Sequence, residues 1–335
     1  MGARAVILGC GGTALTATER RFFADAAPWG FILFARNFAD PAQLRRLTSA
    51  LRDCVGRDAP VLIDQEGGRV ARLRGPDWRE WAPALDECER LPGPDLRARA
   101  MYLRYRLIAA ELRSVGIDVN CAPVLDVIQP STHPVLRNRC YGSDPAEVAA
   151  TGRAVAEGLL AGGVLPVMKH MPGQGRAALD SHLDLPVVTA DPAVLAADFA
   201  PFRALADLPL AMTAHVVYAA HDAEAPATQS ATLVRLMREE IGFDGVLMTD
   251  DLSMKALKGG FAARVRSALS AGCDMVLHCN GDAGEMAEVA SAAPLLTGKA
   301  AARAEVALAR RLGDLADDTA EAAAEFAALK ERAHA

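Results

Sequence analysis

The segment from Lys169 to His182 holds the residue types best suited to acid–base chemistry, together with one proline and two glycines. It ends in an Asp-x-His pair, Asp180 and His182. A carboxylate placed against an imidazole nitrogen orients the ring and favours its protonated form, so such a histidine is a candidate general acid and base near neutral pH. We expect this segment to be a mobile loop. The alternative is a solvated histidine that makes only local hydrogen bonds.

Eight short apolar runs predict the strands that would position this loop, each buried on both faces. The runs are Ala5–Leu8, Phe31–Phe34, Val61–Ile63, Ile117–Val119 with a continuation to Val124, Leu165–Met168, Leu210–Met212, Val246–Met248 and Met275–Leu277. Amphipathic stretches between them predict helices at Leu96–Val115, Ala146–Ala161, Leu233–Ile241 and Phe261–Ala271, with Gly272 as the C-terminal cap of the last. This alternation predicts an α/β fold, either a doubly wound sheet or a (β/α)8 barrel. We favour the barrel because eight strands close it.

The domain organisation follows from the same pattern. We expect a single domain over residues 1–335, in which the barrel spans about residues 4–295. From Thr297 the sequence is alanine-rich and charged without a strand pattern, which predicts one or two helices over about 297–333 that cover the outside or the open end of the barrel. No linker rich in serine, glycine or proline divides the chain.

Composition excludes several classes of protein. Of the 335 residues 51% are hydrophobic and 23% charged, which excludes intrinsic disorder. The net charge is −6 without a basic block, so we expect no nucleic-acid partner. Seven cysteines without a C-x-x-C spacing argue against a disulfide framework or a cysteine zinc site and fit a reducing cytoplasm. No apolar run is long enough for a membrane span, and the short run near the N-terminus predicts a strand rather than a secretion signal.

Polar residues follow six of the eight apolar runs, where a barrel builds its active site. If the barrel closes, these residues converge on one mouth, and the sequence therefore predicts a ligand site there. Asp250 and Asp251 are adjacent after the seventh run, so we expect only one to face the barrel axis and the other to need a helix N-terminus or a lysine. The six groups are Arg36 and Asn37; Asp64, Gln65 and Glu66; Lys169 and His170; Thr213 and His215; Thr249, Asp250 and Asp251; and His278, Cys279 and Asn280.

Five motifs together resemble the family 3 glycoside hydrolases, specifically the bacterial β-N-acetylglucosaminidases (β-hexosaminidases) of peptidoglycan recycling. The resemblance runs from about residue 5 to 290 in the order of the family. The motifs are I-D-Q-E-G-G-R-V at 63–70, N-R-C-Y-G at 138–142, K-H-M-P-G at 169–173 with D-S-H at 180–182, M-T-A-H at 212–215, and G-F-D-G-V-L-M-T-D-D-L-S-M at 242–254.

The resemblance implies a retaining exo-glycosidase that removes terminal N-acetylglucosamine from muropeptide fragments in the cytoplasm. Asp250 matches the nucleophile of a covalent glycosyl-enzyme, and His182 matches the acid/base with Asp180 as its partner. The family has a histidine where Gln174 stands, which affects details of the loop. The implied partner is a small carbohydrate, with no cofactor and no metal; the oligomeric state is left open, and a monomer is compatible with the sequence. The residues that match those holding the sugar hydroxyls are Asp64, Arg72, Arg139, Lys169 and His170.

Several alternatives remain open at this stage. Within the same fold these are a β-glucosidase, a phosphorylase that uses phosphate in place of water, and attack by the acetamido group of the substrate itself. A metal-dependent hydrolase could use His170, His215, Asp64 and Asp250, although no paired histidine motif is present. The run Gly9–Ala14 matches the G-x-G-x-x-A fingerprint of an NAD(P)-dependent oxidoreductase but lacks the expected acidic residue after the second strand. A non-catalytic sugar-binding barrel is the remaining alternative.

Overall fold

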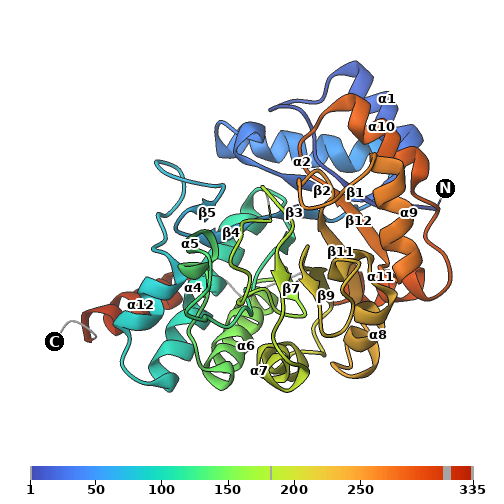
Figure 1. The fold of residues 1–335 in the computed structure, drawn as a ribbon. Helices are drawn as coiled ribbons and strands as arrows, with labels where there is room; N and C mark the ends of the chain where they lie inside the picture. The colour runs from blue at the N-terminus through green and yellow to red at the C-terminus, as the bar shows by residue number, and fades with distance from the viewer. Residues whose placement is uncertain (1, 182, 312–317, 333–335) are drawn as a thin grey trace.

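The structure, a computed structural model, describes residues 2–181, 183–311 and 318–332. Eight parallel strands pair in chain order and the last pairs with the first, which closes a barrel (Figure 1). The predicted (β/α)8 barrel is confirmed, and every predicted strand is present. The strands are β1 (Arg4–Leu8), β2 (Pro28–Leu33), β3 (Val61–Ile63), β6 (Val119–Asn120), β7 (Leu165–Met171), β9 (Leu210–Thr213), β11 (Val246–Asp251) and β12 (Met275–His278).

Helices between successive strands surround this barrel. The four predicted helices are confirmed to within two residues at each end, and Gly272 ends the last of them with a left-handed φ of 111°. Aspartate or serine caps with hydrogen-bonded side chains begin several of the helices, which satisfies backbone N–H groups of the first turn. The helices are α1 (Ala17–Ala26), α2 (Pro41–Val55), α3 (Ala84–Arg90), α4 (Pro94–Ser114), α5 (Pro134–Arg137), α6 (Pro145–Ala161), α7 (Pro192–Ala204), α8 (Ala231–Glu239), α9 (Phe261–Ala271) and α10 (Ala283–Ala292), with 3-10 turns at Ala35–Asn37 and Ala227–Gln229.

Two small additional sheets lie in the loops. The antiparallel hairpin of β4 (Gln65–Gly67) and β5 (Val70–Ala71) follows β3, and β8 (Val187–Val188) pairs with β10 (Val217–Tyr218).

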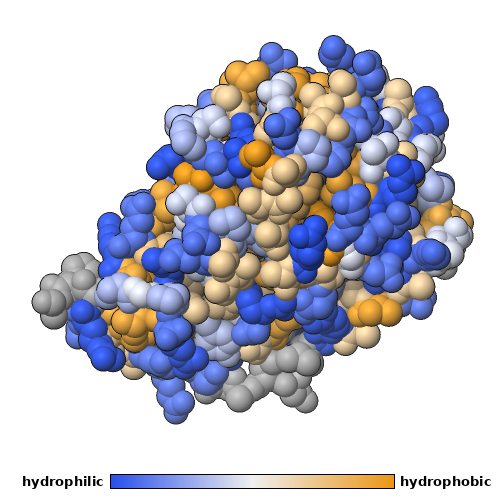
Figure 2. Space-filling view, turned by 60° about the horizontal axis from the view of Figure 1, so that its bottom comes forward, coloured by the Kyte–Doolittle hydropathy of each residue, from blue (hydrophilic) through white to orange (hydrophobic). Residues whose placement is uncertain are grey.

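None of the described helices is both long enough and apolar enough to cross a membrane. On the face shown in Figure 2, hydrophilic residues separate smaller hydrophobic areas. All seven cysteines are free, and six of them are buried.

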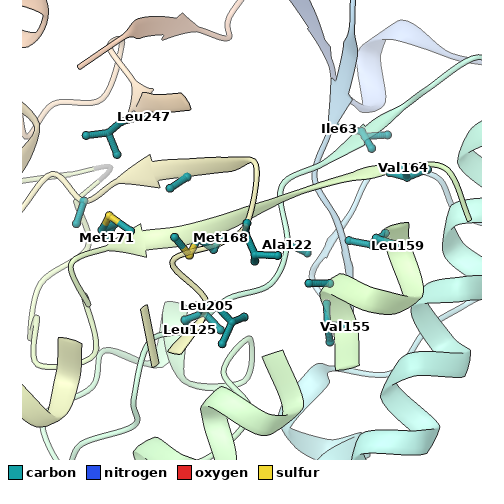
Figure 3. Packing of buried hydrophobic residues seen from close by; sticks show 14 of the residues in the cluster. Ile63, Ala122, Leu125, Val155, Leu159, Val164, Met168, Met171, Leu205 and Leu247 are labelled. Atoms are coloured by element: carbon teal, nitrogen blue, oxygen red, sulfur yellow. The ribbon is translucent and has the colours of Figure 1, made fainter. Parts of the chain in front are cut away.

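Two apolar clusters account for strands that are buried on both faces. One lies between the strands and the helices, where Met168 of β7 packs in the same cluster as Val155 and Leu159 of α6 (Figure 3). The other fills the barrel interior and includes Ile7 and Val167 from opposite parts of the chain. Because neighbouring residues of each strand serve the two clusters alternately, the strands read as continuous apolar runs.

Two helices follow the barrel, as predicted. α11 (Gly298–Ala309) closes its N-terminal end, where Ala304 and Ala307 join the interior cluster. Arg303 of α11 pairs with Asp274, the residue before β12. α12 (Thr319–Arg332) lies against the outside of α4 (Figure 1).

The buried carboxylate of Asp118 joins this closing segment to the barrel. It accepts hydrogen bonds from the backbone N–H of Val61 (2.7 Å) and from Arg52 (3.1 Å) and Arg311 (2.6 Å). We expect Asp118→Ala to lower the free energy of unfolding by about 2–4 kcal/mol, because it leaves one buried N–H without its acceptor and removes one of the two carboxylate partners of Arg52 and of Arg311, which both keep Asp58. Denaturant unfolding of the full chain measures this loss.

The matched control is Asp207→Ala, which removes an exposed partner of Arg153. Exposed ion pairs contribute about 0–1 kcal/mol, so this variant should stay within about 1 kcal/mol of the parent protein. Equal losses in the two variants would contradict a special role for Asp118.

Candidate active site

A pocket of about 180 Å³ lies at the C-terminal ends of the barrel strands. Ile32, Met212 and Leu277 belong to the apolar cluster inside the barrel and form the floor of the pocket, and most of the charged lining residues lie at or beyond the strand ends and form its walls. His182 lies outside the described residues, and Asp180 is half-buried on the loop after β7. The other predicted site residues all line this pocket, namely Asp64, Arg72, Arg139, Lys169, His170 and Asp250.

A chain of ion pairs organises the charged wall. The Lys169 ammonium lies 2.8 Å from Asp64 Oδ1 and 2.6 Å from Glu66 Oε1. Arg72 binds the other oxygen of Asp64 at 2.8 Å, and Arg139 binds Glu66 through two hydrogen bonds of 2.8 and 2.9 Å. Cations and carboxylates therefore alternate along the wall, and each side chain is fixed by at least one partner of opposite charge.

Glu66 was named among the polar residues expected at the mouth of the barrel, but no role in the site was predicted for it. It is buried and provides the partner that both Arg139 and Lys169 need. The signal that could have found it is the spacing of Asp64 and Glu66, since side chains two residues apart in extended chain lie on the same face.

These ion pairs fix the charges as well as the positions. Burial by itself would raise the pKa of Glu66, but Arg139 and Lys169 outweigh burial and lower this pKa to about 2. In the same way Lys169 and Arg72 hold the pKa of Asp64 well below its ordinary value. Burial would lower the pKa of Lys169, but Asp64 and Glu66 raise it above the ordinary value. The wall therefore keeps charged donors and acceptors over a wide pH range, which suits a ligand with several hydroxyl groups.

His170 is held by a second residue that sequence reasoning missed, Asp126. Its Nδ1 lies 2.7 Å from Asp126 Oδ2, and its Nε2 lies 3.4 Å from the guanidinium of Arg139. An arginine can only donate, so Nε2 accepts and Nδ1–H donates to Asp126. These two contacts define the tautomer of the ring in its neutral form. Asp126 is fully buried within an apolar stretch, and this isolated acid was the available signal.

The same carboxylate also anchors the loop after β7. Asp126 Oδ1 accepts a 2.6 Å hydrogen bond from the backbone N–H of Gln174, and this contact does not depend on the side chain at 174. Gly175 packs so closely on Val127 that an added Cβ would lie 1.9 Å from the Val127 carbonyl oxygen. Tyr218 donates to the Gly173 carbonyl at 2.8 Å. The expectation of a mobile loop is therefore wrong for its first half, residues 171–177, because this half is packed and anchored; Ala178 and Leu179 are exposed.

Asp250 and Asp251 end β11, and both line the pocket. The Asp251 carboxylate accepts hydrogen bonds from the Ser253 N–H (3.0 Å), the Ser253 hydroxyl (2.5 Å) and the Cys279 N–H (3.1 Å). The expectation that the second carboxylate pairs with a helix N-terminus or a lysine is wrong, because loop donors satisfy Asp251. Asp251 is committed to these donors, which makes Asp250 the stronger candidate for chemistry.

Two histidines at strand ends do not reach the pocket, although Cys279, next to His278, lines it. His215 is buried, with Nδ1 2.7 Å from the Thr228 hydroxyl and Nε2 donating to the Asp251 carbonyl at 3.1 Å. Its burial lowers its pKa below the ordinary value. His278 points away from the pocket to Glu285 at 3.0 Å. The predicted convergence is right for the polar ends of β3, β7 and β11, and it is wrong for these two histidines, because local partners turn them away.

Comparison with known proteins identifies the family. The model of the glycosyl hydrolase family 3 N-terminal domain matches residues 10–310. The chain belongs to glycosyl hydrolase family 3.

Several proteins are similar to this family 3 hydrolase in sequence or structure over most of their length. A β-hexosaminidase from Methylococcus capsulatus is 42% identical over 274 residues, which cover 80% of each chain. A β-hexosaminidase from Bordetella parapertussis is 39% identical over 286 residues, 82% of this chain and 79% of the relative. The crystal structure of NagZ from Neisseria gonorrhoeae in complex with N-trifluoroacetyl-D-glucosamine superposes with a TM-score of 0.86 at 31% identity, covering 99% of this chain and 96% of that one.

The geometry of this family 3 hydrolase disagrees with two of the alternatives. No group of three or more histidine, cysteine, aspartate or glutamate side chains among the described residues could hold a metal ion. The side chains proposed as ligands have other partners, as His170 and His215 show. In the glycine-rich run after β1, Glu19 accepts the N–H groups of Gly11 and Thr16 at 2.9 Å each, so a carboxylate occupies the donors that a pyrophosphate would need.

Acid titration tests the ion-pair wall. Because the pKa of Glu66 is lower in the folded chain than its ordinary value of 4.5, its ion pairs stabilise the fold fully above about pH 4.5 and lose this effect as the pH falls towards about 2. We therefore expect Glu66→Gln to be less stable than the parent at pH 7, with a difference in Tm that shrinks steadily below pH 4.5. Thermal unfolding at intervals between pH 7 and 3 measures this difference.

Glu239→Gln, at an exposed position on α8, is the control and should stay close to the parent in Tm at pH 7, because it removes no buried ion pair. A Tm difference for Glu66→Gln that stays constant or widens in acid would contradict the low pKa of this carboxyl.

Proposed function

We propose that this family 3 hydrolase is a retaining exo-β-N-acetylglucosaminidase that releases non-reducing terminal N-acetylglucosamine from peptidoglycan fragments. The observation that carries the proposal is the pocket in which fixed charged groups surround Asp250. Two β-hexosaminidase relatives and the N-trifluoroacetyl-D-glucosamine complex of NagZ support the sugar class. We further propose that residues 1–335 form one catalytic domain and act in the cytoplasm, which the free cysteines support.

The wall supplies the contacts that a pyranose ring needs. Asp64 is an acceptor for sugar hydroxyls, and Lys169, Arg72 and Arg139 are donors, since each retains N–H groups beyond those used in its ion pair. Asp126 holds the ring of His170 with Nε2 beside Arg139, so His170 helps to position this guanidinium at the wall. Because these groups are fixed before the sugar binds, little ordering is needed on binding.

Asp250 is the proposed nucleophile. Its carboxylate oxygen forms a bond to the anomeric carbon while the bond from that carbon to the glycosidic oxygen breaks, and the departing oxygen takes a proton from His182. In the second step His182 removes a proton from water, the water oxygen bonds to the anomeric carbon, and Asp250 leaves as a carboxylate. Asp180 is proposed to orient the imidazole of His182 and to favour its protonated form.

Attack by the acetamido group of the substrate is the less favoured route. That route needs an acidic partner for the acetamido group. The only neighbouring acid on the same strand, Asp251, has its carboxylate bound to Ser253 and to the N–H of Cys279. Direct attack by Asp250 therefore fits the site better.

Turnover of p-nitrophenyl N-acetyl-β-glucosaminide, compared with the corresponding β-glucoside, tests the proposed function. We expect the parent enzyme to prefer the glucosaminide and Asp250→Ala to lose turnover of it, because no other group can form the covalent intermediate. A 5-fluoro sugar should label Asp250. Preference for the glucoside would reject the proposed specificity, and a label on Asp251 would reject the proposed nucleophile.

The role of His182 is tested by changing the leaving group. A sugar hydroxyl leaves only when it is protonated, whereas nitrophenolate departs without help. We expect His182→Ala to slow hydrolysis of a disaccharide by about 10²–10⁴-fold, the usual contribution of positioned acid–base catalysis, and to slow release of nitrophenol much less. Asp180→Ala should show the same pattern more mildly. Equal slowing of both substrates in His182→Ala would show that the acid lies elsewhere.

A further inference from the structure

The β4–β5 hairpin places one more cation, Arg69, at the edge of the pocket. The two-residue turn of this hairpin is Gly68–Arg69, and the exposed side chain of Arg69 lines the pocket. The stem of the hairpin is fixed by Gln65, whose side chain accepts from the N–H of Arg72 (2.8 Å) and donates to the carbonyl of Leu73 (2.9 Å). At Gly67, with a φ of +100°, an added Cβ would lie 2.0 Å from the Arg104 guanidinium. Arg69 therefore projects from a rigid base.

The other basic side chains discussed above as lining the pocket form ion pairs with its carboxylates, whereas Arg69 forms none with the described residues. Arg72 pairs with Asp64, Arg139 pairs with Glu66, and Lys169 binds both acids. Within residues 2–181, 183–311 and 318–332, Arg69 has neither an ion pair nor a hydrogen bond through its side chain, so its charge is available to a ligand.

The shape of the pocket determines which part of a substrate Arg69 would meet. The apolar floor of Ile32, Met212 and Leu277 closes the pocket, and a volume of about 180 Å³ accommodates about one sugar ring. The remainder of a longer substrate must lie over the exposed edge. Arg69 is exposed and lines the pocket, so it lies where the leaving group of a longer substrate would extend.

We propose that Arg69 binds a carboxylate on the leaving-group part of the substrate and makes the enzyme selective for acidic aglycones. The guanidinium group presents parallel N–H donors that match the two oxygens of a carboxylate. The proposal rests on the proposed function, because the leaving group is defined by glycoside cleavage at Asp250.

A pair of matched substrates tests the proposal in the full-length enzyme. These are the 3-carboxyphenyl and 3-carbamoylphenyl N-acetyl-β-glucosaminides, which have similar shapes and differ in charge. We expect the parent enzyme to have the higher kcat/KM for the carboxylate and Arg69→Gln to reduce the ratio of the two kcat/KM values about tenfold, which is typical for loss of a hydrogen bond to a charged group. Arg69→Lys should keep part of the preference. Added salt should reduce it in the parent, because salt screens exposed charges.

Arg235→Gln, at an exposed position on α8, is the matched control and should leave the ratio unchanged. Equal effects of Arg69→Gln on both substrates, or no carboxylate preference in the parent, would overturn the proposal while leaving the glycosidase function intact. An effect of Arg69→Gln confined to stimulation by inorganic phosphate would also overturn it, because Arg69 would then serve the acceptor. Failure of the parent to hydrolyse either glucosaminide would overturn the proposed function as well.

Discussion

The site depends on the contact of one buried ammonium group, Lys169, with two carboxylates, Asp64 and Glu66. A charge removed from water costs several kcal/mol unless a partner of opposite sign compensates it. Without Lys169 the two carboxylates would repel each other, and without them the ammonium would be buried alone. This contact therefore fixes the end of β7 against the residues that follow β3, and Arg72 and Arg139 extend it to the loops. The groups proposed to bind the sugar owe their positions to one another.

The barrel itself could be predicted from sequence because its signal is local. Each parallel strand is buried on both faces and so leaves a short apolar run, and Gly272 marks a helix end through its own backbone preference. The last residue of each apolar run also locates the C-terminal end of its strand. This locality explains why the amino-acid sequence is sufficient to predict Asp64, Lys169 and Asp250 in one pocket.

The partners within the site could not be predicted in this way, because they depend on contacts between distant parts of the chain. Asp126 lies 44 residues from His170, and nothing in either local sequence shows that the two meet. His215 follows its strand as Asp64 follows β3, yet a threonine in a 3-10 turn directs it away from the pocket. The glycine at 175 suggested a mobile loop, whereas its actual requirement is close contact with Val127.

The closure of the barrel has a consequence for how the chain folds during synthesis. β1 pairs with β12, and the interior is covered at its N-terminal end by Ala304 and Ala307 of α11. A nascent chain emerging from the ribosome therefore has no partner for the β12-facing edge of its first strand until about four-fifths of the sequence has been made. Until then apolar strand surface and unpaired strand edges are exposed, and such species are prone to aggregate. The synthesis of β12 and α11 thus sets the moment at which the barrel can be completed.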